Sequence, residues 1–484
     1  MNFKMIGLFL SGILALEALF MTPSLLLCIA DDEPDVCVSF LITIGLILII
    51  SGILWLLCHK SKKGFYAREG MVCAGSCWIV MSLLGCMPFY LSGQIPHYID
   101  ALFEMVSGFT TTGSTILSDV EAMSRALLYW RSFSHWLGGM GVLVLLLAVS
   151  SAKKGSGGFT MHILRAESPG PNVGKLVPRM RQTAVVLYIL YIVLTVLNYL
   201  FLIFGDMPWF DAMCTAFGTA GTGGFGVRND SLAGYSPYLQ NVTTVFMILF
   251  GINFSCYFLL VTKHLRSVLF DEEIRLYLGL ILGSILLIVW NLKDYYASTG
   301  ETVRHAAFQV ASIISSSGFA TTDFDLWPNF SKSILLCLMF IGACAGSTGG
   351  GFKCQRVLLL IKSLRCSIKQ AIYPHKVQVL TINKQRVSDK VLVNTHYYLV
   401  AYVIFIFVSF ILVSIDGFSI TTNLSAVVSC FNNIGPGFET VGPTCNFAAY
   451  STFSKLVLIL DMLAGRLEIF PILIFFAPST WHRK

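Results

Sequence analysis

Four short stretches of small, mostly hydroxyl-bearing residues end at a glycine, and each glycine stands at the same distance from the start of a similar segment. The paired first residues and last glycines are Asp100 and Gly113, Asp211 and Gly224, His305 and Gly318, and Thr422 and Gly435. Backbone carbonyls, helped by threonine and serine hydroxyls, are the oxygen ligands that replace water around a dehydrated monovalent cation. Four such stretches around one axis would therefore form a cation-selective filter.

The candidate filter residues are the last three positions of each stretch, where K+ would bind at the carbonyls. They are Thr111, Thr112, Gly113, Thr222, Gly223, Gly224, Ser316, Ser317, Gly318, Asn433, Ile434 and Gly435. Glycine at the end permits backbone torsions that other residues resist. The alternative is that these glycines only allow close packing of membrane helices, where small residues are common. A single stretch favours packing, whereas four aligned stretches favour the filter.

A short helix is predicted in front of each stretch. The predicted helices cover 97–109, 207–219, 301–314 and 419–431. At 1.5 Å per residue, such a helix is about 20 Å long, too short to cross a hydrocarbon core of about 30 Å. Non-helical backbone at membrane depth is tolerated only where protein buries it or where it lines water. The four re-entrant loops are therefore expected to surround a common axis, with the negative ends of the helix dipoles toward the cation.

The composition is that of a membrane protein. Of 484 residues, 55% are hydrophobic and 12% are charged, and the mean hydropathy is +0.74, whereas an average soluble domain is about 25% charged. Apolar runs long enough to cross a bilayer recur along the chain. The predicted spans lie near 5–29, 38–58, 71–92, 127–150, 184–205, 240–262, 274–292, 333–361 (interrupted), 391–415 and 453–480.

The charges indicate the orientation, because lysine and arginine collect in the cytoplasmic loops of membrane proteins. With the N-terminus inside and each span crossing once, most of the 33 lysines and arginines lie on the cytoplasmic side, and the other side collects acids. Both termini are then cytoplasmic, and all four glycine-ended stretches face outward. The net charge of +7 is explained by this topology and by contact with the anionic lipids of the bilayer. Nothing in the sequence indicates that the chain binds nucleic acid.

The sequence thus predicts an all-α polytopic membrane protein with four parallel repeats of span, pore helix, filter and span around one pore. Two additional N-terminal transmembrane helices occupy 1–60, and the repeats cover 70–150, 180–263, 274–365 and 390–484. A membrane enzyme would need clustered His, Asp or Glu residues at membrane depth, which we do not find. The chain is therefore not expected to be an enzyme or to carry a cofactor.

A run of small residues interrupts the last span of the third repeat. The candidate gate positions are Gly342, Gly346, Ser347, Thr348, Gly349, Gly350 and Gly351. Each glycine lowers helix stability by about 1 kcal/mol relative to alanine. The run is therefore expected to unwind at mid-membrane, directly below the filter, and to act as a gate. The alternative is a tight crossing of two helices.

Arg466 lies within the last predicted span, where an arginine is costly and is a functional candidate by default. It is expected to project into the pore as a fixed positive barrier. The alternative is a buried ion pair with Asp461 or Glu468. Neither acid stands at the i, i+4 helical spacing from Arg466, which makes a pair on one helix face unfavourable.

Taken together, these features resemble the superfamily of K+ transporters that includes the Trk and Ktr systems, and most closely the bacterial TrkH family. The resemblance is carried by Ser107 to Thr115, Gly342 to Lys353, Asn433 to Gly437 and Gly465 to Phe470. It covers nearly the whole chain, and the two extra N-terminal spans favour Trk over Ktr. It implies K+ uptake through a gated, channel-like pore in the bacterial inner membrane, a homodimer, and a cytosolic nucleotide-binding regulatory subunit of the TrkA type.

The chain departs from the family pattern in its third stretch, where Ser316 and Ser317 stand in place of the more usual threonines. The stretches also lack the Gly-Tyr-Gly of tetrameric potassium channels, which implies a shorter filter with less stringent selection of K+ over Na+. A secondary transporter that couples K+ to Na+ or H+ is the alternative to passive conduction. Parallel repeats and the scarcity of acids within the spans favour conduction, because secondary transporters often have inverted repeats.

Overall fold

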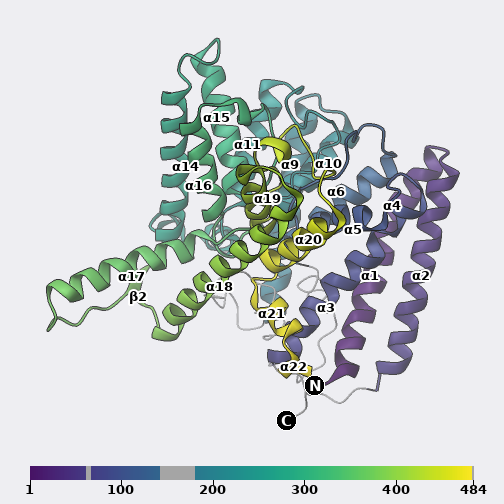
Figure 1. Ribbon diagram of the computed structural model, residues 1–484, viewed down its shortest axis with the longest axis horizontal. Coiled ribbons are helices and arrows are strands. Elements are labelled where there is room, and N and C mark those ends of the chain that lie inside the picture. Colours follow the sequence, from purple (N-terminus) through teal and green to yellow (C-terminus); the bar gives the residue numbers. More distant parts are fainter. Residues whose placement is uncertain (61–66, 142–179, 482–484) are drawn as a thin grey trace.

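The computed structural model describes residues 1–60, 67–141 and 180–481 of the chain. Its described elements are helices apart from one two-stranded hairpin, and six of the described helices are long and apolar enough to cross a membrane. A seventh crossing exists if one bent helix pair counts as a single span. The N-terminus and the last described helix, α22 (Pro478–Trp481), lie at the same end of the molecule (Figure 1). The prediction of an all-α polytopic membrane protein is confirmed.

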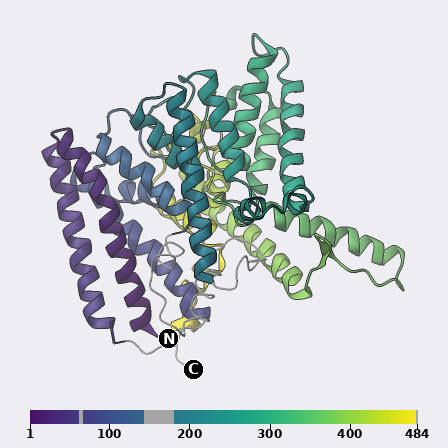
Figure 2. The same cartoon turned by 180° about the vertical axis from the view of Figure 1, so that it is seen from behind.

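The first two helices form a hairpin at one edge of the molecule. α1 (Phe3–Ala30) and α2 (Pro34–Cys58) pack along each other, as both views show (Figures 1 and 2). The hydroxyls of Ser11 and Ser51 each donate to the other residue's carbonyl at 2.9 Å, which pins the two helices at mid-length. α1 also packs against helices of the first repeat, so the hairpin supports that repeat from one side.

Each of the four predicted repeats begins with a long helix, followed by an outer turn and a short helix. The long helices are α3 (Ala67–Gly85, followed by α4, Met87–Leu91), α9 (Met180–Phe204), α14 (Glu272–Asn291) and α18 (Asp389–Val413). The short helices are α5 (Tyr98–Phe109), α10 (Trp209–Gly221), α15 (Thr299–Ile314) and α19 (Ile420–Asn432). The short helices lie within a few residues of their predicted bounds. Their last two turns are almost completely buried, because both the long helices and the second helices of the repeats pack around them.

The second helix of each repeat is short or broken. These helices begin as α6 (Arg125–Gly139), α11 (Pro237–Phe250), α16 (Asn329–Ile341) and α20 (Thr452–Arg466). α11 meets α12 (Phe254–Val261) at an angle of 91°, and the glycine run separates α16 from α17 (Cys354–Ile372). A further break separates α20 from α21 (Phe470–Phe476). The predicted residues 142–150 of the first repeat lie outside the described residues.

The continuous spans predicted at 240–262 and 453–480 are therefore wrong. Each second segment starts with its own helix signal: the Asn253 side chain caps α12 by accepting the N–H of Ser255 (2.9 Å), and Pro471 stands in the first turn of α21. Asparagine caps and first-turn prolines are typical helix starts. Glu468 and Ile469 also have positive φ (59° and 62°), which ends α20.

The remaining elements lie between or beyond the repeats. α13 (Leu265–Leu269) joins the second repeat to the third, and α22 (Pro478–Trp481) follows α21. α17 extends sideways from the bundle (Figure 1) and returns to α18 through the hairpin of β1 (Thr381–Ile382) and β2 (Gln385–Arg386). Three single turns lie near the outer loops: η1 (Phe324–Leu326), η2 (Ser414–Asp416) and η3 (Glu439–Val441).

Candidate functional site

All four short helices end in the same hydrogen-bonded turn. In α5 the N–H of Thr111 donates to the Gly108 carbonyl (3.1 Å), and the N–H of Thr112 donates to the Ser107 carbonyl (2.9 Å). This pair of bonds is the Schellman motif, which closes a helix on a left-handed residue. The second bond recurs from Gly223 to Gly218 (2.8 Å), from Ser317 to Ser312 (2.8 Å) and from Ile434 to Ser429 (3.0 Å).

The backbone after each helix repeats one unusual pair of torsions. The residue two positions before the final glycine has positive φ in Thr111 (56°), Thr222 (57°), Ser316 (58°) and Asn433 (53°). The final glycine also has positive φ in Gly113 (83°), Gly224 (76°), Gly318 (76°) and Gly435 (105°). A left-handed residue other than glycine costs about 1–2 kcal/mol, and such strain gathers at functional sites. Its fourfold recurrence marks these positions as one site.

The four glycine segments (111–113, 222–224, 316–318 and 433–435) form a closed ring. In each segment, a Cβ atom added to the final glycine would meet a carbonyl oxygen of another segment. The pairs are Gly113 with Gly223, Gly224 with Ser317, and Gly318 with Ile434, which would all overlap, and Gly435 with Thr112 at 3.0 Å. The contacts therefore run from the first segment to the second, third and fourth and back to the first. The structure brings all the predicted filter residues together, and at three of the four ring glycines an added Cβ would overlap a backbone oxygen.

Hydroxyl and amide groups support the ring at its inner side. The Thr110 and Thr112 hydroxyls lie 2.7 Å apart, and those of Ser315 and Ser317 lie 2.8 Å apart. The Asn433 amide donates to the Thr112 hydroxyl at 2.8 Å. The first and third segments therefore each have their own pair of hydroxyls. The Asn433 side chain links the fourth segment to the first.

The fourth segment differs in how its final carbonyl is used. The Gly435 oxygen accepts hydrogen bonds from the hydroxyls of Ser114 (2.9 Å) and Ser429 (2.8 Å). A carbonyl that already accepts two bonds has little capacity left for another ligand. The four segments are therefore alike in backbone but not equivalent as oxygen donors.

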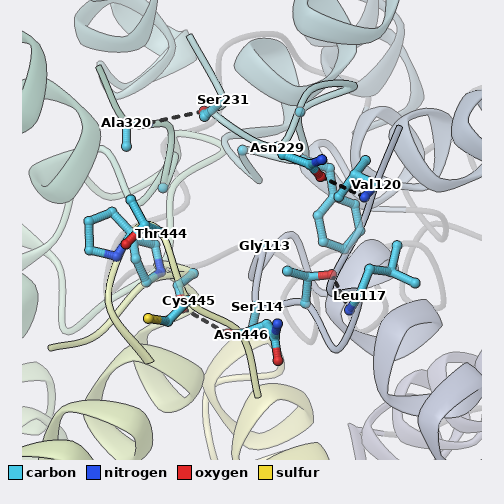
Figure 3. A pocket seen from close by; sticks show the side chains of 18 of the residues that line it. Gly113, Ser114, Leu117, Val120, Asn229, Ser231, Ala320, Thr444, Cys445 and Asn446 are labelled. Atoms are coloured by element: carbon cyan, nitrogen blue, oxygen red, sulfur yellow. Dashed lines mark hydrogen bonds between the residues drawn. The ribbon is translucent and has the colours of Figure 1, made fainter. Parts of the chain in front are cut away.

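An outer cavity of about 140 Å³ opens onto the ring. All four ring glycines line it, together with residues of the loops that follow them. Neighbouring loops are joined by hydrogen bonds from the Val120 N–H to the Asn229 side chain (2.7 Å) and from the Ala320 N–H to the Ser231 hydroxyl (3.2 Å) (Figure 3). These bonds fix the mouth of the ring.

Two outer acids are held in their charged form. Hydrogen bonds from the hydroxyls of Ser419 and Thr422 lower the pKa of Glu439. A hydrogen bond from the Asn229 side chain lowers the pKa of Asp119. Carboxylates that stay ionised on the outer face raise the local concentration of cations.

The predicted gate segment lies directly against the inner side of the ring. Gly342 (74°), Gly346 (72°) and Gly351 (83°) have positive φ, so the run is a loop and not a helix crossing. The Gly350 N–H donates to the Ser316 hydroxyl at 2.5 Å. A Cβ on Gly350 would also overlap the Asn432 carbonyl. The loop therefore contacts the third and fourth segments where their helices end.

The far side of this loop is fixed by the break in the second repeat. The Cys344 N–H donates to the Gly251 carbonyl and the Phe254 N–H donates to the Gly346 carbonyl, each at 3.0 Å. The Thr348 hydroxyl donates to the Phe250 carbonyl at 3.2 Å. Backbone groups left free where α11 ends thus find partners in the loop, which explains why both irregular segments are tolerated at membrane depth.

Arg466 spans the space below the ring. Its guanidinium donates to the carbonyls of Thr348 (2.9 Å) and Gly139 (2.7 Å) and to the Thr111 hydroxyl (3.3 Å). It also contacts the Gly138 carbonyl. Arg466 thus links the fourth repeat to the first and to the loop of the third.

The two acids considered as partners of Arg466 on its own helix are engaged elsewhere. Glu468 pairs with Arg356 of α17, and Asp461 accepts a hydrogen bond from the Ser409 hydroxyl at 2.6 Å. The guanidinium of Arg466 instead faces backbone carbonyls, and its role as a barrier stays a prediction.

The sequence reasoning gave no role in the site to several residues that the structure places beside it, and it interpreted His135 as a packed residue. His135 of α6 is fully buried and bonds the Gly108 carbonyl at 2.8 Å. Lys353 donates to the Gly349 carbonyl of the loop. Glu104 and Arg131 form a buried ion pair beside the ring. Charged residues inside predicted membrane segments were the available signal, but the sequence reasoning assigned a role from it only to Arg466.

These observations define a class of protein: a multi-pass membrane protein in which four short helices end on one ring of backbone carbonyls. Within the described residues, no group of three or more His, Cys, Asp or Glu side chains could hold a metal ion, so backbone and hydroxyl oxygens are the ligands that the ring offers. The TrkH family, described as "Cation transport protein", matches residues 38–483. The chain belongs to this family, as its sequence resemblance indicated.

Individual relatives cover almost the whole chain. The Trk system potassium uptake protein TrkH of Salmonella typhimurium is 35% identical over 453 residues, 92% of each chain. The Trk system potassium uptake protein TrkG of Escherichia coli is 32% identical over 474 residues, 96% of each chain. The crystal structure of the potassium transporter TrkH from Vibrio parahaemolyticus matches with a TM-score of 0.89 at 29% identity, over 100% of both chains.

Proposed function

We propose that this chain takes up K+ across the cytoplasmic membrane through a gated, channel-like pore, as the membrane subunit of a Trk system. Membership of the TrkH family and the names of the relatives support K+ as the transported ion. The single observation that carries the pore mechanism is the closed ring of glycine segments. A tight ring of backbone oxygens is suited to strip water from a monovalent cation.

In this proposal K+ binds at the carbonyls of the four glycine segments. Residues 111–113, 222–224, 316–318 and 433–435 form the selectivity filter. The short helices direct their negative dipole ends toward this ring, which favours a cation. The engaged Gly435 carbonyl makes the site asymmetric, in keeping with the expectation of less stringent selection than in tetrameric channels.

The loop at 342–351 and Arg466 then close the path on the inner side. Three contacts support this assignment: the loop bonds Ser316, its Gly350 abuts Asn432, and Arg466 crosses from the fourth repeat to Thr111. A guanidinium below the filter repels a departing K+ and occupies its path. Conduction therefore requires both the loop and the Arg466 side chain to move out of the path.

The proposal includes a bacterial inner-membrane location with both termini in the cytoplasm. The position of the N-terminus and α22 at one end of the molecule (Figure 1) and the distribution of lysine and arginine support it. It also includes a homodimer and a cytosolic nucleotide-binding partner of the TrkA type. The second copy of the chain and the regulatory subunit are both inferred from the family resemblance.

Purified protein in liposomes tests the proposal. With K+ on one side, wild-type vesicles should develop a K+ diffusion potential, and vesicles without protein should not. Absence of K+ flux with and without a co-expressed regulatory subunit would refute it.

Coupling to Na+ or H+ is the second candidate, since Glu17 and Asp461 are buried carboxyls within helices. A reversal potential that shifts with a Na+ or pH gradient at fixed K+ would establish coupling.

A further inference from the structure

Two opposite charges lie buried beside the ring. Glu104 of α5 and Arg131 of α6 are 1% and 2% exposed, and Arg131 Nε lies 2.5 Å from Glu104 Oε1. Burying two charges is costly unless both are paired and fully hydrogen-bonded. The additional contacts of this pair therefore show what the pair holds in place.

The carboxylate of Glu104 holds the backbone that leaves the first glycine segment. Its oxygens accept the Thr115 hydroxyl (3.0 and 3.1 Å) and the Ile116 N–H (3.0 Å). The Thr115 carbonyl in turn accepts the N–H of Phe447, in the outer loop of the fourth repeat, at 2.8 Å. One carboxylate thus fixes the outer limb of the first segment and, one bond further, a loop of the fourth repeat.

The guanidinium of Arg131 holds the backbone that leaves the second segment. Its Nη1 donates to the Gly226 carbonyl at 3.0 Å, just beyond Gly224. The guanidinium carbon also lies 3.5 Å from the centre of the Phe225 ring, a cation–π contact. Arg131, Phe225 and Gly226 line the outer cavity together with the ring glycines. The pair therefore joins the outer limbs of two neighbouring segments.

The other repeats lack this pair. At the position of Glu104, counted back from the ring glycine, they have Thr215, Gln309 and Ala426. Gln309 is a neutral counterpart: it is fully buried, and its amide donates to the Thr322 carbonyl at 3.4 Å. An ionic link between segments therefore belongs to the first repeat, where it acts on the first, second and fourth repeats.

We propose that Glu104 and Arg131 form a clamp that sets the spacing of the first two glycine segments and so contributes to the selection of K+ over Na+. The proposal rests on the K+ pore function proposed above. Both are positioning residues, because they act on the ring through the backbone and offer no ligand to the ion. Lysine cannot replace Arg131, because a point charge cannot bond Glu104 and Gly226 at once in the planar geometry of a guanidinium.

The test compares the reversal potentials of variants in liposomes with K+ and Na+ on opposite sides. Arg131→Lys keeps the charge, and the double variant Glu104→Gln with Arg131→Gln removes both charges without leaving either one unpaired. Arg125→Gln is the matched control, because Arg125 lies on the same helix and pairs with Asp31 at the surface (3.1 Å). The permeability ratio does not depend on the amount of protein, so it separates positioning from a general loss of stability.

We expect the ratio of K+ to Na+ permeability to fall at least fivefold in Arg131→Lys and in the double variant, and to be unchanged in Arg125→Gln. Ratios within twofold of the wild type in both test variants would overturn the clamp. Loss of folded protein in both would assign the pair to stability alone and would also overturn it. Failure of the proposed function would look different, since the wild-type chain itself would then show no K+ flux.

Discussion

The replacement of Gly113 by serine perturbs the ring at one position. Gly113 has φ of 83°, and an added Cβ would overlap the Gly223 carbonyl oxygen, which is backbone and cannot rotate away. The serine must therefore bear a strained conformation and also displace an oxygen of the neighbouring segment. Both effects fall on the proposed ion-binding site.

The magnitude follows from these two effects. A left-handed residue other than glycine costs about 1–2 kcal/mol. Strain is relieved by moving the Gly223 carbonyl, and each 1.4 kcal/mol of difference between two ions is about a tenfold change in their ratio. If the free-energy difference that favours K+ over Na+ falls by this 1–2 kcal/mol, the ratio of K+ to Na+ permeability falls about five- to thirtyfold.

Gly93→Ser is the matched control for this experiment. Gly93 has φ of 73°, and nothing lies within 4 Å of an added Cβ, so serine there bears the same strain without displacing a carbonyl. Reversal potentials in liposomes with opposing K+ and Na+ should show reduced selectivity in Gly113→Ser and wild-type selectivity in Gly93→Ser. A Gly113→Ser protein that conducts with a ratio within twofold of the wild type would refute the filter assignment.

Three further outcomes are expected. Arg466→Ala should raise K+ flux at matched protein amount by removing the barrier, while Arg365→Ala, on the exposed face of α17, should not; equal or lower flux in the first variant would contradict the barrier. Gly350→Ala should also raise flux, because its Cβ would push the loop from the Asn432 carbonyl, and unchanged flux would count against the loop as a gate. The lowered pKa of Glu439 contributes stability above its unfolded pKa of about 4.3, which is lost as the pH falls through the folded value. Thermal unfolding between pH 7 and about 2.5 should therefore show a steeper loss of stability below about pH 4.3 in the wild type than in Glu439→Gln, and parallel curves would exclude this contribution.

The features that depend on periodicity and composition could be predicted from the sequence. Repeated spacing located Gly113, Gly224, Gly318 and Gly435, and apolar runs located the long first helices. The glycine-rich run at 342–351 was correctly expected to interrupt its helix. The apolar runs and the glycine-rich run are local signals, and the four glycines required only a comparison of short windows along the chain. The roles assigned to these residues in ion binding and gating stay predictions.

The features that depend on contacts between repeats could not be predicted. Thr111 and Ser316 occupy a left-handed position that usually takes glycine or asparagine, so local preference argued against the turn that they form. The pairing of Glu104 with Arg131 depends on the packing of α5 against α6 and of α10 against α6. The order of the segments around the ring likewise exists only after the chain has folded.

The breaks in the second helices follow from the way the ring is held from below. A Cβ on Gly138 would overlap the Phe109 carbonyl, one on Gly465 would overlap the Phe431 carbonyl, and one on Gly349 would lie 2.7 Å from the Ser315 carbonyl. In three repeats, then, a glycine near the end of the second helix or in the loop after it lies against the last carbonyls of the short helix.

A helix that continued in a straight line with ordinary side chains could not come this close. The same close approach leaves backbone groups free at the break, and in the third repeat these groups belong to the loop that contacts Arg466. The same irregular backbone, the loop at 342–351, therefore both supports the ring and closes the proposed path. A movement that opens the loop must change the support of the third segment, so we expect flux and selectivity to change together in variants of the loop.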